Sequence, residues 1–174
     1  GKLVTTSGNV TGVEVNVIGG NISNSANLTG TANTTVSATS GALVNNGTIS
    51  GTNVIVTAKG GNVTNNQNIS GINVNITASN ITGNSSNYIS AESNITLNAT
   101  AGDLTVTNVS AKNYITLGAS NTLNIAGNLN ALNTVNLSGG KLVTTSGNVT
   151  GVEVNVIGGN ISNSANLTGT ANTT

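Results

Sequence analysis

The sequence is most informative in what it lacks. Its 174 residues include no Cys, Pro, His, Met, Trp, Phe or Arg, and Tyr88 and Tyr114 are its only aromatic residues. Without Cys no disulfide can form, although that absence does not indicate a compartment. With no His and with Asp103 as the only Asp, the side chains that usually act as general bases are missing or isolated.

Charge is scarce and balanced, with four Lys against four acidic residues. A protein that binds duplex nucleic acid needs several Lys or Arg to displace counterions, so we expect no nucleic-acid partner. Apolar runs are only a few residues long, too short to span a bilayer. No charged leader with an apolar core stands at the start, so we expect any export signal to lie outside this segment.

The apolar residues that are present argue against disorder. Hydrophobic residues make up 36% of the chain and are mainly Val, Ile, Leu and Ala. Disordered chains are typically poor in aliphatics and rich in charge, whereas this chain is the opposite. Its aliphatics are suited to stacking in thin layers.

The chain repeats itself without a single substitution. Residues 1–35 recur as residues 140–174. An identical copy is expected in a segment of a tandem array and not in an ordinary enzyme domain. We therefore treat residues 1–174 as one segment, in which residues 1–139 are a full repeat unit and residues 140–174 begin the next.

A weaker period of about 20 residues divides the unit into seven smaller repeats of three phrases each. The first phrase begins with an aliphatic residue, as in LVTTSG at Leu3 and LVNNG at Leu43. The second is short and ends in a small residue, as in NVTG and NISG. The third alternates apolar and polar residues, as in VEVNVIGG and NVNITAS, which is the period-two pattern of a half-buried strand.

The alternation identifies the residues expected to face inward. In the third phrase the inward pairs are Val15 and Val17, Val54 and Val56, Val74 and Ile76, Ile95 and Leu97, Ile115 and Leu117, and Val135 and Leu137. A small residue follows each phrase at the next inward step: Gly19, Ala38, Ala58, Ala78, Ala99, Ala119 and Gly139. The second phrase supplies the ladder Val10, Leu28, Ile49, Ile69, Ile89, Val109 and Leu129.

These patterns predict an all-β fold, a right-handed parallel β-helix (β-solenoid) with three strands per coil and nearly nine coils of about 20 residues. Apolar residues do not recur at helical spacing, and Asn, Gly and β-branched residues disfavour helix. The frames of leucine-rich, calcium-binding nonapeptide and hexapeptide solenoids do not fit. One coil buries too few side chains to fold alone, so neighbouring coils must stabilise it.

The phrases NVTG…VEVNVIGGNI, GTISGTNVIVTAKGG and AGDLTVTNVSAKNYITLGAS resemble the repeats of filamentous-haemagglutinin-like exoproteins. Bacteria release these proteins by two-partner secretion, and the density of Asn-aliphatic-Ser/Thr is most similar to the high-molecular-weight adhesins. The resemblance implies a secreted protein on the bacterial cell surface that adheres to host-cell receptors or glycans. It also implies an outer-membrane transporter as secretion partner; the family's secretion domain and anchor are expected outside this segment.

Catalysis is not expected. The β-helical polysaccharide lyases need clustered carboxylates for a metal and a basic group that takes a proton. The single Asp and the absence of His and Arg leave no coil able to assemble such a group. We expect no enzymatic activity, no cofactor and no metal site, and we interpret Asp103 and Lys112 as solvated surface charges.

Asn invites a functional interpretation. Fourteen Asn in residues 1–139 begin Asn-X-Ser/Thr, about twice the number expected by chance. Strand alternation alone produces this spacing when Asn and Thr share the outer face, and other Asn suit corners, where amides stack in ladders. The resemblance implies instead that some carry N-linked sugars. The preferred candidates are Asn75, Asn98 and Asn136, followed by Asn9, Asn27, Asn62, Asn68 and Asn94.

Three functions remain open from the sequence. The first is the shaft of a surface-displayed adhesin, since copy number can tune the length of a verbatim array. The second is a structural filament or matrix protein whose copies associate side by side or end to end. The third is the stalk of a contact-dependent toxin. Tyr88 and Tyr114 each precede an inward Ile and should point outward, where a ring can contact a sugar, contact a partner rod or simply be exposed.

Overall fold

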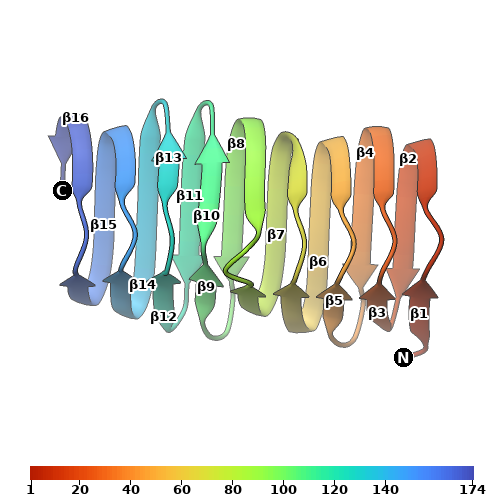
Figure 1. Ribbon diagram of the computed structural model, residues 1–174. Helices are drawn as coiled ribbons and strands as arrows, with labels where there is room; N and C mark the ends of the chain where they lie inside the picture. The colour runs from red at the N-terminus through yellow and green to blue at the C-terminus, as the bar shows by residue number, and fades with distance from the viewer.

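The computed structural model describes residues 1–174 as a β-solenoid of about nine turns, with successive turns roughly 20 residues apart. In Figure 1 the chain rises on the near side, descends on the far side and advances from right to left, so the coil is right-handed. No helix is present, and every strand pairing is parallel. The predicted fold class is therefore confirmed.

Sixteen strands form one continuous sheet that wraps around the solenoid axis. They are β1 (Leu3–Thr6), β2 (Val10–Gly19), β3 (Asn21–Asn24), β4 (Leu28–Ala38), β5 (Leu43–Asn45), β6 (Ile49–Asn65), β7 (Ile69–Gly83), β8 (Tyr88–Ala99), β9 (Leu104–Val106), β10 (Asn108–Ala111), β11 (Tyr114–Ala119), β12 (Thr122–Ile125), β13 (Leu129–Ala131), β14 (Thr134–Thr145), β15 (Val149–Asn163) and β16 (Leu167–Thr173).

The pairing register divides the continuous sheet into three faces, one for each sequence phrase. The first face contains β1, β3, β5, β9 and β12 and the final segments of β6, β7, β14 and β15. The second face begins at Val10, and the third begins near Glu14. In most turns the second and third phrases form one long strand that bends at a register shift, as between Gly30 and Asn33.

Three corners separate the faces, and we name them from their places in Figure 1. The upper corner joins the second face to the third, at residues such as 12–14 and 91–94. The lower corner joins the third face to the next turn's first face, at residues such as 58–62 and 139–142. The front corner joins the first face to the second, at residues such as 66–68.

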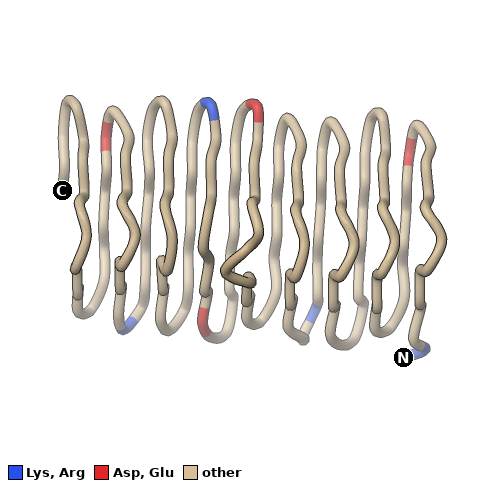
Figure 2. Tube along the Cα trace, in the orientation of Figure 1, with Lys and Arg blue, Asp and Glu red and all other residues tan.

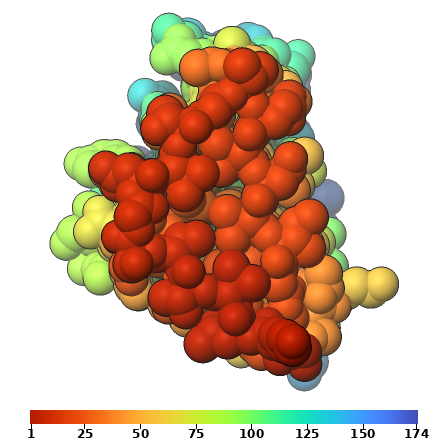
Figure 3. All heavy atoms as spheres, turned by 90° about the vertical axis from the view of Figure 1, so that its right-hand side faces the viewer, coloured from red at the N-terminus to blue at the C-terminus, as the bar shows by residue number.

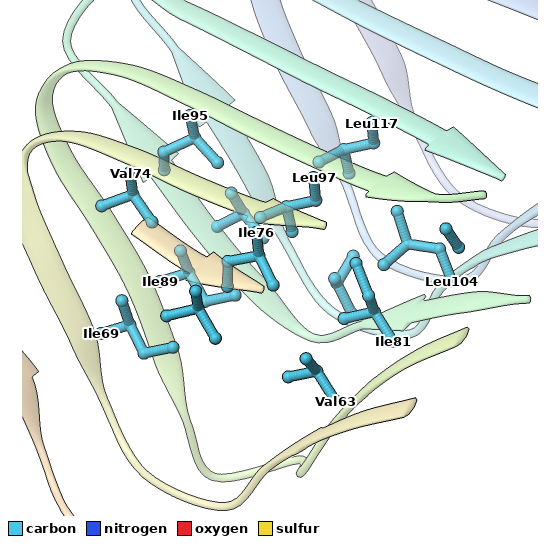
Figure 4. Packing of buried hydrophobic residues seen from close by; sticks show 14 of the residues in the cluster. Val63, Ile69, Val74, Ile76, Ile81, Ile89, Ile95, Leu97, Leu104 and Leu117 are labelled. Carbon is cyan, nitrogen blue, oxygen red and sulfur yellow. The ribbon is translucent and has the colours of Figure 1, made fainter. Parts of the chain in front are cut away.

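The third face supplies two aliphatic columns to the core. One column runs through Val54, Val74, Ile95, Ile115 and Val135, and the other runs through Val56, Ile76, Leu97, Leu117 and Leu137. All of these side chains are buried, as predicted. Figure 4 shows Val74, Ile76, Ile95, Leu97 and Leu117 pointing toward residues of the other two faces.

Thr34 interrupts the first of these columns without leaving a polar group unsatisfied. Its side chain is fully buried. The Thr34 hydroxyl accepts a hydrogen bond from the Gly30 amide at 2.9 Å and donates one to the Ser50 carbonyl at 2.6 Å. A buried hydroxyl is tolerated where both its donor and its acceptor capacity are used. Here the two hydrogen bonds connect Thr34 to backbone groups beside the upper corner.

Neighbouring turns, rather than local sequence, bury the aliphatic residues. Ile22 and Ile161 occupy the same place in the two identical copies. Ile22 lies between Val4 and Leu43 and is 1% exposed, whereas Ile161, in the last turn of the rod, is 51% exposed. Val10 and Val149 are the equivalent pair on the second face. Val10, in the first turn, is 37% exposed, whereas Val149 is 0% exposed. Each turn is thus stabilised by the turns on both sides, as in other repeat proteins.

The first phrase is shifted by one residue in the first turn. Leu3 pairs with Asn21 and is exposed, while Val4 pairs with the inward residue Ile22. The aliphatic residue that begins LVTTSG is therefore not the one that faces the core. A shift of one residue moves a side chain to the opposite face of a strand.

A buried asparagine ladder lies on the first face, whereas the sequence predicted amide ladders only at corners. Asn24, Asn45 and Asn65 are at most 1% exposed and occupy the inward position two residues after the aliphatic one. The Asn24 amide nitrogen donates to Asn45 Oδ1 at 2.7 Å, and the Asn45 amide nitrogen donates to Asn65 Oδ1 at 2.7 Å. Each amide therefore supports the amide of the next turn.

The ladder ends at the only turn that carries a longer loop at the front corner. Residues 84–87 form a turn between β7 and β8, and the green segment of this region stands out on the left of the end-on view in Figure 3. The Asn87 amide nitrogen donates to the Asn65 carbonyl at 2.7 Å. In two later turns the inward position is aliphatic, at Val106 and Ile125, and in the turn after them it is again polar, at the buried Thr145.

The junction between the two copies lies inside a strand. β14 runs from Thr134 to Thr145 through the boundary at Gly139 and Gly140, and its register continues into β15 after a shift at the lower corner. Small residues suit this corner, because a Cβ on Gly139 would lie 2.3 Å from the Leu142 carbonyl oxygen. The core therefore continues from one copy into the next.

We predict that core and surface positions of one strand differ sharply in their contribution to stability. Ile115→Ala removes a fully buried side chain of β11 and should lower the free energy of unfolding by about 2–5 kcal/mol. Thr116→Ala, on the exposed side of the same strand, should cost less than about 1 kcal/mol. Urea unfolding of the two variants tests this, and equal losses would contradict the inward assignment.

The asparagine ladder predicts a second contrast. Asn45→Ala removes the only donor to Asn65 Oδ1 and the acceptor of one Asn24 hydrogen bond. Leaving such buried groups unpaired should cost at least about 2 kcal/mol. The neighbouring Asn46→Ala removes only an exposed acceptor of the Asn66 amide and should be nearly neutral. The measurement is the urea midpoint, and a neutral Asn45→Ala would show that the ladder does not stabilise the rod.

Candidate recognition surface

The outer side of the third face is mainly polar and uncharged, with Ile18, Ile55 and Ile157 as exposed apolar residues. A hollow of about 340 Å³ lies on it between Asn53 and Thr96. Two columns of side chains alternate with the buried aliphatics of the strands. One contains Thr35, Ile55, Asn75, Thr96, Thr116 and Asn136, and the other contains Ser37, Thr57, Thr77, Asn98, Gly118 and Ser138. The short hydroxyl and amide side chains leave this surface accessible to a partner or a modifying enzyme.

The three preferred glycosylation candidates lie on this surface. Asn75 and Asn98 are exposed, and Asn136 is half-buried. Asn75 Oδ1 accepts a weak hydrogen bond from the Thr77 hydroxyl at 3.4 Å, and Asn136 Oδ1 accepts one from the Asn155 amide at 3.0 Å. In all three residues Nδ2, the atom to which an N-linked sugar is attached, donates no hydrogen bond within the protein.

Three further candidates lie at the front corner, where each accepts a backbone amide of the following turn near the start of the second face. Asn9 Oδ1 accepts the Asn27 backbone amide at 3.2 Å, and Asn27 Oδ1 accepts the Thr48 backbone amide at 3.3 Å. Asn68 Oδ1 accepts the Tyr88 backbone amide at 2.9 Å. All three side chains are exposed, so the oxygen connects one turn to the next while Nδ2 faces solvent.

The last two candidates belong to amide ladders at the other corners. Asn62, at the lower corner, is exposed and accepts the Asn80 amide at 2.8 Å. Asn94, at the upper corner, is half-buried and donates through Nδ2 to Asn73 Oδ1 at 3.2 Å. Asn94 Oδ1 is buried without a partner. Of the eight candidates, Asn94 therefore presents its amide nitrogen least well for modification.

Both tyrosines point outward, as predicted. Tyr88 is 56% exposed and begins β8 on the second face, next to Asn108 of β10. Tyr114 is 45% exposed and begins β11 on the third face, next to Asn94 of β8. Only Tyr88 lines a hollow of the surface.

Two hollows follow the outer side of the second face. A shallow groove of about 580 Å³ runs along the upper corner from Gly30 to Lys112 and is lined mainly by Ser, Thr and Gly. A smaller hollow of about 250 Å³ lies beside Tyr88. Ser110 lines both hollows, so they meet at β10.

Charged residues are confined to two corners of the rod, as Figure 2 shows. The upper corner holds Glu14, Glu92, Lys112 and Glu153, and the lower corner holds Lys2, Lys59, Asp103 and Lys141. Glu92 and Lys112 form an exposed ion pair. The Asp103 carboxylate accepts hydrogen bonds from the Asn121 side chain and the Thr122 backbone amide, at 2.7 and 3.0 Å.

No group of three or more His, Cys, Asp or Glu side chains gathers where it could hold a metal ion. The structure also contains no helix that is long and apolar enough to cross a membrane. Its notable surfaces are the mainly polar third face, the hollows of the second face and the oppositely charged corners.

Comparison with known proteins found no matching family model, no matching curated protein and no matching solved structure.

We predict a graded pattern of glycosylation in protein isolated from its native host. Asn75 and Asn98 are exposed, and their Nδ2 atoms donate no hydrogen bond within the protein, so they should carry hexose. Asn94, whose Nδ2 donates to Asn73, should carry the least hexose. Peptide mapping by mass spectrometry measures occupancy at each Asn. An intact mass without added hexose would refute the modification altogether, and full occupancy at Asn94 would show that the folded geometry does not govern it.

Proposed function

We propose that this chain is part of the structural shaft of a secreted, surface-displayed bacterial adhesin that supports attachment to host cells. The observation that carries the proposal is the junction inside β14, where one copy of the repeat continues into the next with an unbroken core. A rod that can be extended at such junctions by whole copies is suited to hold a binding region away from a surface.

The geometry gives this shaft a defined increment. One unit of 139 residues contains seven turns, and neighbouring parallel strands lie about 4.8 Å apart, so each added copy lengthens the rod by roughly 34 Å. Since every turn is buried by its neighbours, added copies also stabilise the rod. Length can change without any change in surface chemistry.

The bacterial surface and the secretion route come from the resemblance of the repeats to two-partner-secretion exoproteins. In this proposal an outer-membrane transporter exports the chain, and host-cell receptors or glycans are its partners. The role is mechanical and adhesive rather than enzymatic. The sparse charge and the many short polar side chains of the outer faces support this role, because they offer weak contacts over a long surface.

A self-associating filament is the second candidate, and the two charged corners favour it. The upper corner carries three carboxylates and one ammonium group, and the lower corner carries the reverse. Val13, Ile72, Leu132 and Val152 are exposed along the upper corner. Rods placed side by side could pair the upper corner of one with the lower corner of the next, and such pairing would weaken as salt screens the charges.

The test uses Fab fragments raised against the 174-residue chain and applied to the source bacterium. The adhesin proposal predicts that the Fab labels intact cells and lowers their adherence to epithelial cells in a dose-dependent manner. A Fab of the same format against an unrelated surface protein is the control. Failure to label intact cells, or labelling with unchanged adherence, would contradict the proposal.

Electron microscopy of the purified chain separates the two candidates. A shaft should appear as single rods in both low and high salt. A filament should form ordered bundles in low salt that disperse in high salt. Such bundles, together with unchanged adherence in the Fab experiment, would support the filament and contradict the adhesin.

A further inference from the structure

Tyr88 forms one wall of a hollow on the outer side of the second face. The hollow has a volume of about 250 Å³ and is lined by Tyr88, Asn108, Val109, Ser110, Asn128 and Asn130. Tyr88, Asn108 and Asn128 form one column of neighbouring turns, and Ser90, Ser110 and Asn130 form the next. The hollow is smaller than a typical pocket for a drug-sized ligand and is suited to a single ring.

The polar side chains of this hollow have unused hydrogen-bonding capacity. Asn108 Oδ1 accepts the Asn128 backbone amide at 3.4 Å, and Asn128 Oδ1 accepts the Asn148 backbone amide at 3.0 Å. These bonds fix the two side chains and leave both Nδ2 groups free as donors. The side chains of Ser110 and Asn130 make no hydrogen bond within the protein, so each offers both donors and acceptors.

Other turns of the same face differ in this respect. In the second and third turns the Thr48 hydroxyl donates to Asn27 Oδ1 at 2.7 Å, and the Ser50 hydroxyl donates to Thr29 Oγ1 at 3.2 Å. These hydroxyl groups are therefore already hydrogen-bonded to side chains of the preceding turn, and the groove that Ser50 lines has no aromatic residue. Among the hollows of the surface, only the one beside Tyr88 combines unpaired polar side chains with an exposed aromatic ring.

We propose that this hollow binds a neutral saccharide ring, with the Tyr88 ring against the apolar side of the sugar and Asn108, Asn128, Asn130 and Ser110 bonded to its hydroxyl groups. A tyrosine supplies apolar contact area together with a polar tip, and amides and hydroxyls match the mixed donors and acceptors of a sugar. The inference deepens the proposed adhesin function, on which it rests, by naming the chemical class of ligand.

The charges around the hollow favour a neutral sugar over an acidic one. No charged residue lines it. The nearest cation of the joining groove, Lys112, is paired with Glu92, so it is not free to bind a carboxylate or a sulfate. A sialylated or sulfated sugar would therefore gain nothing from this site.

The site gains importance through repetition. If the second copy continues as the first does, the hollow recurs once in every 139 residues, roughly 34 Å apart along the rod. A single shallow site should bind a sugar ring with a Kd on the order of 1 mM. Several sites on one rigid shaft can bind a surface of many sugars far more tightly, because later contacts become intramolecular.

The experiment is a titration of the isotope-labelled, unglycosylated 174-residue chain, followed by NMR. The probes are glucose, galactose, mannose and N-acetylglucosamine, together with neutral oligosaccharides of each and sialyllactose as the acidic comparison. The expected result is a saturable shift of the Asn108, Asn128 and Asn130 side-chain amide signals with at least one neutral probe. Tyr88→Ala should weaken binding at least tenfold, whereas Tyr114→Ala, which removes the other exposed ring, should leave it unchanged.

Three results would overturn the saccharide site: no probe shifts these amides, Tyr88→Ala binds like the unaltered chain, or sialyllactose binds more tightly than every neutral probe. None of these results tests the adhesin proposal, which the Fab experiment tests separately. The source of the sugar is separated by two assays on glycosylated protein. Loss of epithelial-cell binding in Tyr88→Ala indicates host glycans, and loss of rod-to-rod association indicates the N-linked sugars of neighbouring shafts.

Discussion

The in-register stacking of each turn on the next is the constraint on which the rest of this structure depends. Parallel pairing satisfies the backbone groups of one turn with those of its neighbour, and it places side chains of the same kind above one another. The identical residues Ile22 and Ile161 show the consequence, since only the one with a turn on both sides is buried. Without this stacking no turn has a core.

The same constraint explains why asparagine is so abundant. A planar amide that both donates and accepts can extend through neighbouring turns without loss of pairing. In the core, Asn24, Asn45 and Asn65 form such a ladder. At the front corner, Asn9 and Asn68 instead accept the backbone amide of the following turn. At the upper and lower corners, further amides form ladders between turns, as between Asn94 and Asn73. On the third face, the Nδ2 atoms of Asn75 and Asn98 donate no hydrogen bond within the protein and are available for contact or modification.

Much of the fold could be predicted because alternation is a strong signal. The third-phrase pairs, such as Ile95 and Leu97, are buried as the period of two required. The small residues that follow them are buried too, such as Ala99, except Gly19 in the first turn, which is half-buried. The outward positions of Tyr88, Tyr114 and Asn75 followed from the same alternation. The candidate surface could be predicted only to that extent, because which amides are free depends on hydrogen bonds between turns about 20 residues apart.

Other features could not be predicted because the sequence signal was absent or misleading. Asn45 and Asn46 are adjacent and of the same type, so residue type does not show which of them is buried. The strand register decides, because it places Asn45 two residues after the inward Leu43. The two aliphatic residues Leu3 and Val4 pose the same problem. The hollow beside Tyr88 could not be predicted either, because its lining residues come from three turns, in β8, β10, Asn128 and β13. The Asn128 side chain is in turn fixed by a hydrogen bond from the Asn148 backbone amide of a fourth turn.

Small-angle X-ray scattering of two chain lengths tests the central claim most directly. The 174-residue chain is compared with one that carries an additional copy of residues 1–139. Stacked turns predict that the longest dimension increases by roughly 34 Å while the cross-section of the rod stays constant. An additional copy that thickens the particle, or that adds a separate globule, would contradict the account.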